Sequence, residues 1–374
     1  MRYYIIAGEA SGDLHGSNLI KELKQLDQGG LIRCWGGDKM EAAGGELVKH
    51  YRELAFMGFT EVLMNLRTIF RNLKFCKEDI LAWKPDAIVL IDYPGFNLRI
   101  AKWAKQQGIK VIYYISPQVW AWKENRVKMM KECIDKMLVI LPFEKDYYRD
   151  KWNWEVEYVG HPLVEVIEKE KATRPVEIES KGKPIVALLP GSRKQEILKK
   201  LPVMLEVSQS FPDHQFFVAK APGVEESFYD DILRPYTNVS YVSNQTYALL
   251  IQSRAALVTS GTATLETALF GVPEVVCYKG SAISYQIAKR VIKVKYISLV
   301  NLIMDRLVVK ELIQDEMTAP NLLRELKALL QDEERRKQLA ADYAELRSKL
   351  SEGGRASGKA AASIYTFLTM IDSG

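Results

Sequence analysis

Residues 87–97 read AIVLIDYPGFN, an apolar run followed by an acid, a turn and a polar residue. A run that is apolar on both faces is typical of a strand in a parallel sheet that helices cover. Further runs of this kind recur, each followed by a turn and a helical pattern: Tyr3–Ala7, Val111–Ser116, Met137–Leu141, Ile185–Leu189, Gln215–Ala219, Ala255–Thr259 and Glu274–Tyr278. This alternation of strands and helices predicts an α/β fold.

The chain divides into two halves of similar organisation. Its 374 residues are enough for two ordinary domains. Residues 165–183 are crowded with charge, carry Pro175 and Gly182, and read as a linker or as a surface helix with a linker. Two α/β halves joined in this way place a crevice between them, where ligands of such proteins usually bind.

The composition excludes several classes of protein. The hydrophobic fraction is 48% and the charged fraction 26%, as in soluble globular proteins. No apolar run approaches the roughly 20 residues of a membrane-spanning helix, and the N-terminal apolar stretch is too short for a signal peptide, so we expect a cytoplasmic chain. The four cysteines suit reduced thiols. A net charge of +5 is too weak to indicate a nucleic-acid partner.

Asp92 is the first candidate for a catalytic base. It directly follows the apolar residues 87–91. The carboxyl ends of parallel strands face the ligand crevice, so an acid at this point is well placed to accept a proton. The alternative is that Asp92 caps the helix that follows.

The segment Gly8–Gly16 reads GEASGDLHG and lies between the first strand and a helix. Its glycines allow a tight turn, and a helix N-terminus attracts anions. The spacing does not match a dinucleotide fingerprint. The alternative is an ordinary strand–helix turn in which Ser11 or Asp13 caps the helix.

Two further motifs belong to the first half. Residues 116–122 read SPQVWAW just after a strand, so Trp120 and Trp122 either line a pocket or stack on a sugar, or else pack in the core. His161 stands in a Gly-His-Pro turn before the linker. A lone histidine in a turn is more often structural, but this one lies where the two halves would meet.

Two turns of the second half suit a bound anion. Residues 188–193 read LLPGSR, and Arg193 would clamp a phosphate at a helix start. Residues 260–266 read SGTATLE after the strand Ala255–Thr259. Backbone N–H groups at such a helix start form a diphosphate cradle, and Glu266 would accept hydrogen bonds from a ribose. A simple capping turn is the alternative.

Several catalytic motifs are missing from the sequence. It contains no Walker A pattern, no His-Glu-x-x-His, no Cys-x-x-Cys and no Gly-x-Ser-x-Gly. It also contains no Asp-x-Asp, so Mg²⁺ held by paired carboxylates is not indicated. We therefore expect no metal and no cofactor.

Taken together, these motifs resemble the lipid-A-disaccharide synthase family of nucleotide-sugar glycosyltransferases. The resemblance runs through most of the chain and rests on Gly8–Asp13, Ile91–Asn97, Ser116–Trp122, Tyr158–Pro162, Leu188–Arg193, Ser260–Glu266, Asn301–Ile303 and Glu311–Gln314. The chain departs from the family at Gly95, where an acid is common, and this leaves the role of base to Asp92 alone.

The resemblance implies an α/β fold with two Rossmann-like domains facing across a cleft, the GT-B architecture. Residues 1–165 would form an acceptor-binding domain, completed by the C-terminal helix of about residues 350–374. Residues 184–349 would form a UDP-sugar-binding domain, and residues 166–183 would link the two.

The implied reaction is an inverting transfer from UDP-2,3-diacylglucosamine to 2,3-diacylglucosamine 1-phosphate. It would release UDP and form the β-1,6-linked disaccharide 1-phosphate of lipid A biosynthesis. Asp92 would act as the base, with Glu9 and Ser11 also catalytic and Trp120 and His161 in the cleft. The resemblance assigns the UDP-sugar site to Arg193, Ser260, Gly261, Thr262, Ala263, Thr264, Glu266, Asn301, Glu311 and Gln314.

The implied lipid substrates would bring the chain to the cytoplasmic face of the inner membrane as a peripheral protein. Residues 56–77 carry large apolar side chains at helical spacing beside Arg67, Arg71 and Lys74, a pattern typical of an interfacial helix. Met57, Phe59 and Leu63 are our candidates for membrane or acyl-chain contact. The alternative is an amphipathic helix packed on its own sheet, and the oligomeric state is left open.

Two other functions fit these motifs. One is another enzyme of the same architecture, a UDP-N-acetylglucosamine transferase or 2-epimerase, which would use unacylated sugars. The other is a non-catalytic protein that binds a sugar nucleotide or a membrane surface. Release of UDP from donor and acceptor would exclude the second.

Overall fold

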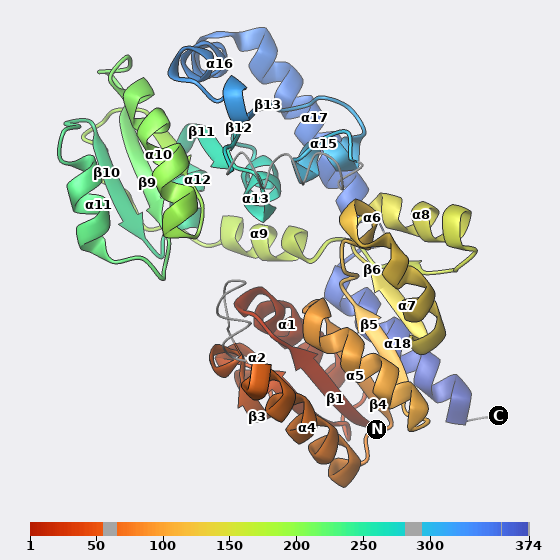
Figure 1. Ribbon diagram of the computed structural model, residues 1–374. Coiled ribbons are helices and arrows are strands. Elements are labelled where there is room, and N and C mark those ends of the chain that lie inside the picture. The colour runs from red at the N-terminus through yellow and green to blue at the C-terminus, as the bar shows by residue number, and fades with distance from the viewer. Residues whose placement is uncertain (55–65, 281–293, 353, 373–374) are drawn as a thin grey trace. The chain divides into compact units, whose positions relative to one another are not determined.

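The computed structural model describes residues 1–54, 66–280, 294–352 and 354–372. The chain forms two compact units, Met1–Pro162 with Leu350–Gly374 and Leu163–Lys349 (Figure 1). Residues 166–183 fall within the second unit and begin inside a helix, α9 (Pro162–Ala172). Glutamate and lysine are good helix formers. Helix α9 buries Val166 and Ile167 on one side and exposes charged residues such as Glu168 on the other.

The first unit is a parallel sheet with helices on both faces. The strand order is β3-β2-β1-β4-β5-β6-β7, and every strand pair is parallel. The elements are β1 (Arg2–Ala7), α1 (Ala10–Leu26), β2 (Leu31–Gly36), α2 (Asp38–Ala42), β3 (Glu46–His50), α4 (Leu66–Trp83), β4 (Ala87–Ile91), α5 (Pro94–Gln106), β5 (Lys110–Tyr114), α6 (Val119–Trp122), α7 (Val127–Cys133), β6 (Lys136–Val139), α8 (Pro142–Trp152), β7 (Glu157–Tyr158) and α18 (Ala356–Asp372).

The alternation of side chains along β1 divides the core of this unit into two layers. Tyr3 and Ile5 point to the face that α1 and α18 cover, and the C-terminal helix packs there through Ile364. Tyr4 and Ile6 point to the opposite face, beneath α4, α5 and α7. All four side chains are fully buried. Burial of one large apolar side chain typically contributes about 1.5–3 kcal/mol, so both layers stabilise the central strands.

The second unit repeats this plan with a six-stranded parallel sheet. The strand order is β10-β9-β8-β11-β12-β13. The elements are α9, β8 (Ile185–Leu189), α10 (Lys194–Ser208), β9 (Gln215–Lys220), α11 (Glu226–Leu233), β10 (Val239–Ser243), α12 (Thr246–Gln252), β11 (Ser253–Thr259), α13 (Thr262–Phe270), β12 (Glu274–Tyr278), α15 (Leu299–Met304), β13 (Lys310–Ile313), α16 (Ala319–Gln331) and α17 (Glu333–Ser351).

Both sheets reverse their strand order at one point. In the first unit, β2 and β3 extend from one side of β1, and the chain then continues on its other side with β4. In the second unit the reversal lies between β8 and β11. Ligands of open α/β sheets bind outside the carboxyl ends of the strands at such a switch point. The turns that follow β1, β4, β8 and β11 are therefore the places to look for a site.

The expected α/β fold is confirmed, and every predicted run contains a strand. All four cysteines are buried and free. Within the described ranges, no helix has both the length and the apolar character needed to cross a bilayer.

Candidate active site

Asp92 stands in a strained turn at the carboxyl end of β4. Asp92 and Tyr93 both have left-handed backbone conformations, with φ angles of 45° and 48°. Such conformations cost non-glycine residues of order 1–3 kcal/mol each and persist only where the surroundings enforce them. The ring of Tyr93 lies so close to Gly8 that a Cβ atom on residue 8 would come within 2.3 Å of the ring. Glycine at position 8 therefore allows the turns after β1 and β4 to meet.

Buried hydrogen bonds hold this turn in place. The backbone carbonyl of Asp92 accepts a bond from the Tyr113 hydroxyl at 2.6 Å and another from Asn97 Nδ2 at 2.8 Å. Asn97 Nδ2 also lies 3.2 Å from the carbonyl oxygen of Ile91, and the Asn97 side chain is fully buried. Asn97 and Tyr113 therefore fix the Asp92 backbone and leave its carboxyl group out of this network.

The surroundings of Asp92 raise the pKa of its carboxyl group to about 6. Burial is the larger cause, because it disfavours the charged form, and the negative charge of Glu9 adds to it. A carboxylate with such a pKa is still ionised at neutral pH and is a better proton acceptor than an ordinary aspartate. The structure thus brings Asp92 and Glu9 together from the two strands at the switch point.

The start of α1 differs from the capping turn considered above. Glu9 occupies the N-cap position but makes no side-chain capping bond, and both Glu9 and Ser11 are exposed. Asp13 is buried and accepts hydrogen bonds from the backbone N–H groups of Gly37 at 2.8 Å and Met40 at 3.0 Å. Asp13 therefore caps α2 rather than its own helix, so the alternative in which Ser11 or Asp13 caps α1 is wrong.

Trp120 is tied to a buried acid. Its indole Nε1 donates to Glu144 Oε1 at 3.2 Å, and its ring packs edge-on against Phe143. Burial raises the pKa of Glu144 to about 8, although backbone N–H groups, among them that of Leu141, stabilise its charge. Sequence reasoning did not identify Glu144, because only the fold brings α6 and α8 together.

His161 is buried in the first unit. Its backbone N–H donates to the carbonyl of Leu350 at 3.1 Å. Burial, with a smaller contribution from His15, lowers the pKa of His161 to about 3, so the ring is neutral at physiological pH. His161 therefore packs between the end of the first sheet and the segment that begins at Leu350.

The second unit presents two turns at its own switch point. Gly191, after β8, has a φ of 125°, and Gly261, after β11, has a φ of 149°. Arg193 is the N-cap residue of α10, with a side chain that is 67% exposed and paired only loosely with Glu196 at 3.8 Å. Both turns therefore adopt conformations that favour glycine, and Arg193 projects into solvent beside the first of them.

The turn before α13 is braced from within the unit. Ser260 Oγ donates to the carbonyl of Ile297 at 2.9 Å, and Thr264 Oγ1 donates to the carbonyl of Gly261 at 2.9 Å. Gly261 and Thr262 are exposed, and Ala263 is partly exposed. The free N–H groups of a helix start attract anions, so the exposed part of this turn is its backbone.

Glu266 has a partner that the sequence did not indicate. The Tyr247 hydroxyl donates to Glu266 Oε1 at 2.7 Å. Burial raises the pKa of Glu266, and this hydrogen bond opposes the shift. Tyr247 therefore orients the carboxyl group that we expected to bind a ribose.

Asn301 and Glu311 are buried and bonded to their own unit. Asn301 Oδ1 accepts from the backbone N–H groups of Val308 and Val309, while its Nδ2 donates to Glu311 Oε1 at 2.8 Å. Glu311 in turn accepts from the backbone N–H of Ser298 at 2.9 Å. This network holds the backbone at Ile297, whose carbonyl fixes Ser260, so both residues shape the turn rather than present groups to a ligand.

Gln314 also bonds to its own unit. Its Oε1 accepts from the backbone N–H of Gly280 at 3.1 Å.

The candidates for membrane or acyl-chain contact, Met57, Phe59 and Leu63, lie outside the described residues. Among the residues that are described, no cluster of three metal-binding side chains occurs.

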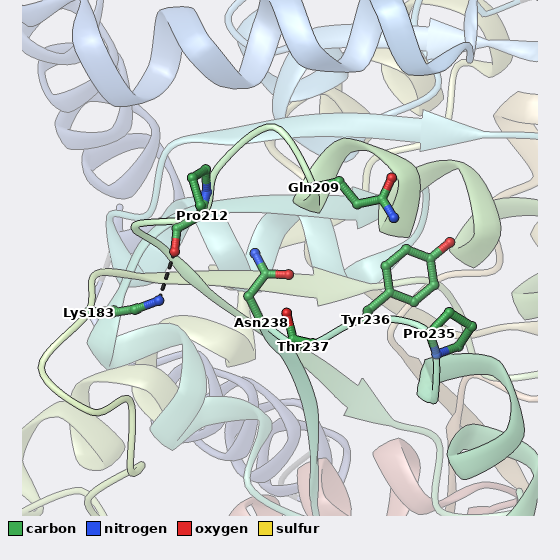
Figure 2. Close-up of a pocket in the computed structure, with 7 residues that line it drawn as sticks. All are labelled: Lys183, Gln209, Pro212, Pro235, Tyr236, Thr237 and Asn238. Carbon is green, nitrogen blue, oxygen red and sulfur yellow. Dashed lines mark hydrogen bonds between the residues drawn. The ribbon is translucent and has the colours of Figure 1, made fainter.

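A cavity of about 330 Å³ lies elsewhere in the second unit (Figure 2). Lys183, Gln209, Pro212, Pro235, Tyr236, Thr237 and Asn238 line it. These residues precede β8, β9 and β10 or follow α10 and α11, and Lys183 Nζ donates to the carbonyl of Pro212 at 2.7 Å. The cavity therefore lies at the amino ends of the strands, away from Ser260 and Gly191.

Solved structures share this architecture. A UDP-N-acetylglucosamine 2-epimerase from Neisseria meningitidis, bound to UDP-N-acetylglucosamine, matches with a TM-score of 0.67 and 14% identity over 99% of this chain and 100% of that one. The kitacinnamycin glycosyltransferase matches with a TM-score of 0.69 and 16% identity over 98% and 99%. At such identities the likeness establishes the fold alone.

Sequence relatives are much closer. The lipid-A-disaccharide synthase of Syntrophus aciditrophicus is 39% identical over 98% of both chains, and that of Geobacter sulfurreducens is 38% identical over 94% of both. The family model described as lipid-A-disaccharide synthetase matches residues 3–365. The chain therefore belongs to the lipid-A-disaccharide synthetase family, a family of glycosyltransferases.

Proposed function

We propose that this enzyme transfers a 2,3-diacylglucosamine unit from its UDP-linked form to 2,3-diacylglucosamine 1-phosphate. The product is the β-1,6-linked disaccharide 1-phosphate, and UDP leaves. The observation that carries the proposal is Asp92, a carboxyl group with a raised pKa held at the switch point of a chain from this family. That position and that pKa suit a base for a sugar hydroxyl.

In the proposed mechanism, Asp92 accepts the proton of the acceptor 6-hydroxyl as its oxygen attacks the anomeric carbon of the donor. The bond between that carbon and the diphosphate oxygen breaks on the opposite face, and UDP leaves with the electron pair. One displacement of this kind inverts the anomeric carbon. Glu9 acts by keeping the Asp92 pKa high, and the exposed Ser11 hydroxyl contacts the acceptor.

The second unit holds the donor in this proposal. The diphosphate binds to Arg193 and to the exposed N–H groups at Gly261, Thr262 and Ala263. These groups stabilise the negative charge that develops on the UDP leaving group. Glu266, oriented by Tyr247, accepts hydrogen bonds from the ribose. Asn301 and Glu311 support the Ser260 turn through Ile297, and Gln314 holds the backbone at Gly280. Arginine and backbone dipoles provide the charge stabilisation without a metal ion.

We also propose that the enzyme meets its acylated substrates at the cytoplasmic surface of the inner membrane. Helix α4 supports this idea, because the Phe70 side chain is 63% exposed although Leu73 on the same helix is buried. Arg71 and Lys74 are exposed beside Phe70. An apolar side chain next to basic ones is the pattern of a surface that binds anionic lipid.

One experiment tests this proposal against an epimerase of the same fold. The purified enzyme is incubated with both acylated sugars, and the products are analysed by mass spectrometry for disaccharide and UDP. A second incubation supplies UDP-N-acetylglucosamine alone. Disaccharide formation that requires both substrates supports the transfer, whereas epimerisation of the unacylated sugar nucleotide without any acceptor would replace it by the alternative.

A further inference from the structure

Lys200 is a buried cation beneath both turns of the donor unit. It lies on α10, and its side chain is almost wholly buried, with 3% of the residue exposed. Its Nζ donates to the hydroxyl of Thr259, the last residue of β11. The same Nζ lies 3.4 Å from the point where a Cβ atom of Gly191 would stand. One ammonium group therefore touches the chain just after β8 and just before the Ser260 turn.

The charge of Lys200 is poorly compensated. Its Nζ donates to a neutral hydroxyl, and Lys200 forms no ion pair within residues 1–54, 66–280, 294–352 and 354–372. The Glu196 carboxylate stands nearby, with Oε2 2.8 Å from the same Gly191 Cβ position, but its ion pair is with Arg193. Burial lowers the pKa of Lys200, Lys199 lowers it slightly, and Glu196 and Cys277 oppose the shift. A buried ammonium without an ion pair is costly, and an incoming anion relieves that cost.

We propose that Lys200 is the inner cation of the diphosphate site and stabilises the UDP leaving group from beneath the Gly191 and Ser260 turns. This inference rests on the donor site proposed above. Arg193 is exposed and reaches the diphosphate from the solvent side, whereas Lys200 acts from the buried side. Thr259 positions the ammonium, since its hydroxyl is the hydrogen-bond partner of Nζ.

The test compares UDP with uridine, which lacks the diphosphate. Calorimetry measures the affinity of both for the full chain and for Lys200→Met, which keeps much of the apolar stem and removes the charge. Lys199→Met is the matched control, because it removes the same charge from the neighbouring, exposed position on α10. A charged hydrogen bond is worth roughly ten- to a hundredfold in affinity. We expect Lys200→Met to lose that factor for UDP and less than twofold for uridine, with Lys199→Met unchanged for both.

Several outcomes would overturn the proposal. Equal UDP affinities of wild type and a folded Lys200→Met would remove Lys200 from the diphosphate site and leave the donor site itself standing. Equal losses for UDP and uridine would make Lys200 a structural residue. Absence of UDP binding to the wild type would refute the donor site and this inference together.

A wild-type measurement decides the matter if Lys200→Met does not fold. The ratio of UDP to uridine affinity is followed from pH 8 to pH 10.5, where the phosphates are fully ionised and uracil ionisation affects both ligands alike. Burial raises the pKa of Cys277 to about 12, so this thiol stays neutral over that range. We expect the ratio to fall as the ammonium loses its proton, and a constant ratio would overturn the proposal.

Discussion

Asp92→Asn removes the proposed base and leaves the shape of the site almost unchanged. Asparagine has nearly the volume of aspartate and tolerates the left-handed backbone that position 92 requires. The Asn97 and Tyr113 bonds go to the backbone carbonyl, so they survive the substitution. A general base typically contributes 10²–10⁴-fold in rate. We expect kcat to fall by about that factor while UDP affinity stays the same.

The same substitution should not lower stability at neutral pH. The folded-state pKa of Asp92 is about 6, above the ordinary value of 3.8, so folding favours the protonated acid. The contribution of Asp92 to the free energy of unfolding is therefore greatest below pH 3.8 and falls as the pH rises through 6. At pH 7 the ionised carboxyl group lowers that free energy by up to about 3 kcal/mol relative to an aspartate with an unshifted pKa. Water that reaches the half-buried carboxyl group reduces this cost. Asp92→Asn should therefore melt at or above the wild-type temperature.

The assay follows UDP release with both acylated sugars from pH 5 to pH 8.5. We expect kcat/KM to fall tenfold per unit below pH 6, because the ionised carboxyl group is the active form. Glu9→Gln removes the charge that helps to raise the pKa, so the acid limb should move to lower pH. Asp86→Asn, the same change just before the other end of β4, is the control and should keep full activity. Near-normal kcat in Asp92→Asn, or an acid limb near pH 4 in the wild type, would refute the role of Asp92.

Four further outcomes are expected. Arg193→Ala should weaken UDP binding roughly ten- to a hundredfold without changing the melting temperature, since the side chain is mostly exposed; unchanged calorimetric affinity would make Arg193 irrelevant to the diphosphate. Asn97→Ala should lose about 1–3 kcal/mol of unfolding free energy in a denaturant titration and most of kcat, because the Asp92 carbonyl loses a partner; full activity would show that the turn holds without it. Turnover should persist in EDTA, and loss that Mg²⁺ restores would contradict the metal-free mechanism. Phe70→Ser with Arg71→Gln should weaken binding to anionic liposomes, measured by co-sedimentation, and the lost charge should account for about 1 kcal/mol of the lost binding free energy. Leu31→Ser, at another exposed apolar position, should bind as the wild type does. Equal binding by both variants would place the membrane contact elsewhere.

The central strands could be predicted because they are buried on both faces. Five strands were not predicted: Leu31–Gly36, Glu46–His50, Glu157–Tyr158, Val239–Ser243 and Lys310–Ile313. Four of them lie at an edge of their sheet, and Leu31–Gly36 lies inside the first sheet but carries the charged Arg33. An edge strand has one free side and carries polar or charged side chains, which hide it from a search for apolar runs. A search for apolar runs therefore finds the strands that are apolar on both faces and misses those that carry polar or charged side chains.

The candidate site shows the same limit. The strand-end position of Asp92 followed from the sequence, because an acid after an apolar run is a local pattern. Asn301 and Glu311 were also assigned to the site from the sequence, yet their side chains form hydrogen bonds inside their own unit. Asn97 and Tyr113 meet at the Asp92 carbonyl from two elements. Tertiary packing decides where a polar side chain points, and no local pattern contains that information.

The two switch points share one topology, and the proposed mechanism assigns a different role to each. The proposed base is a side chain, and the turn after β4 carries Asp92 and Tyr93 in left-handed conformations that are costly for them. Buried bonds from Asn97 and Tyr113 offset that cost. The proposed diphosphate site uses backbone N–H groups, and the turns after β8 and β11 place Gly191 and Gly261 at positive φ, where glycine adopts the conformation without strain. Among the turns after β4, β8 and β11, non-glycine residues therefore adopt the left-handed conformation only after β4, where the proposed base stands.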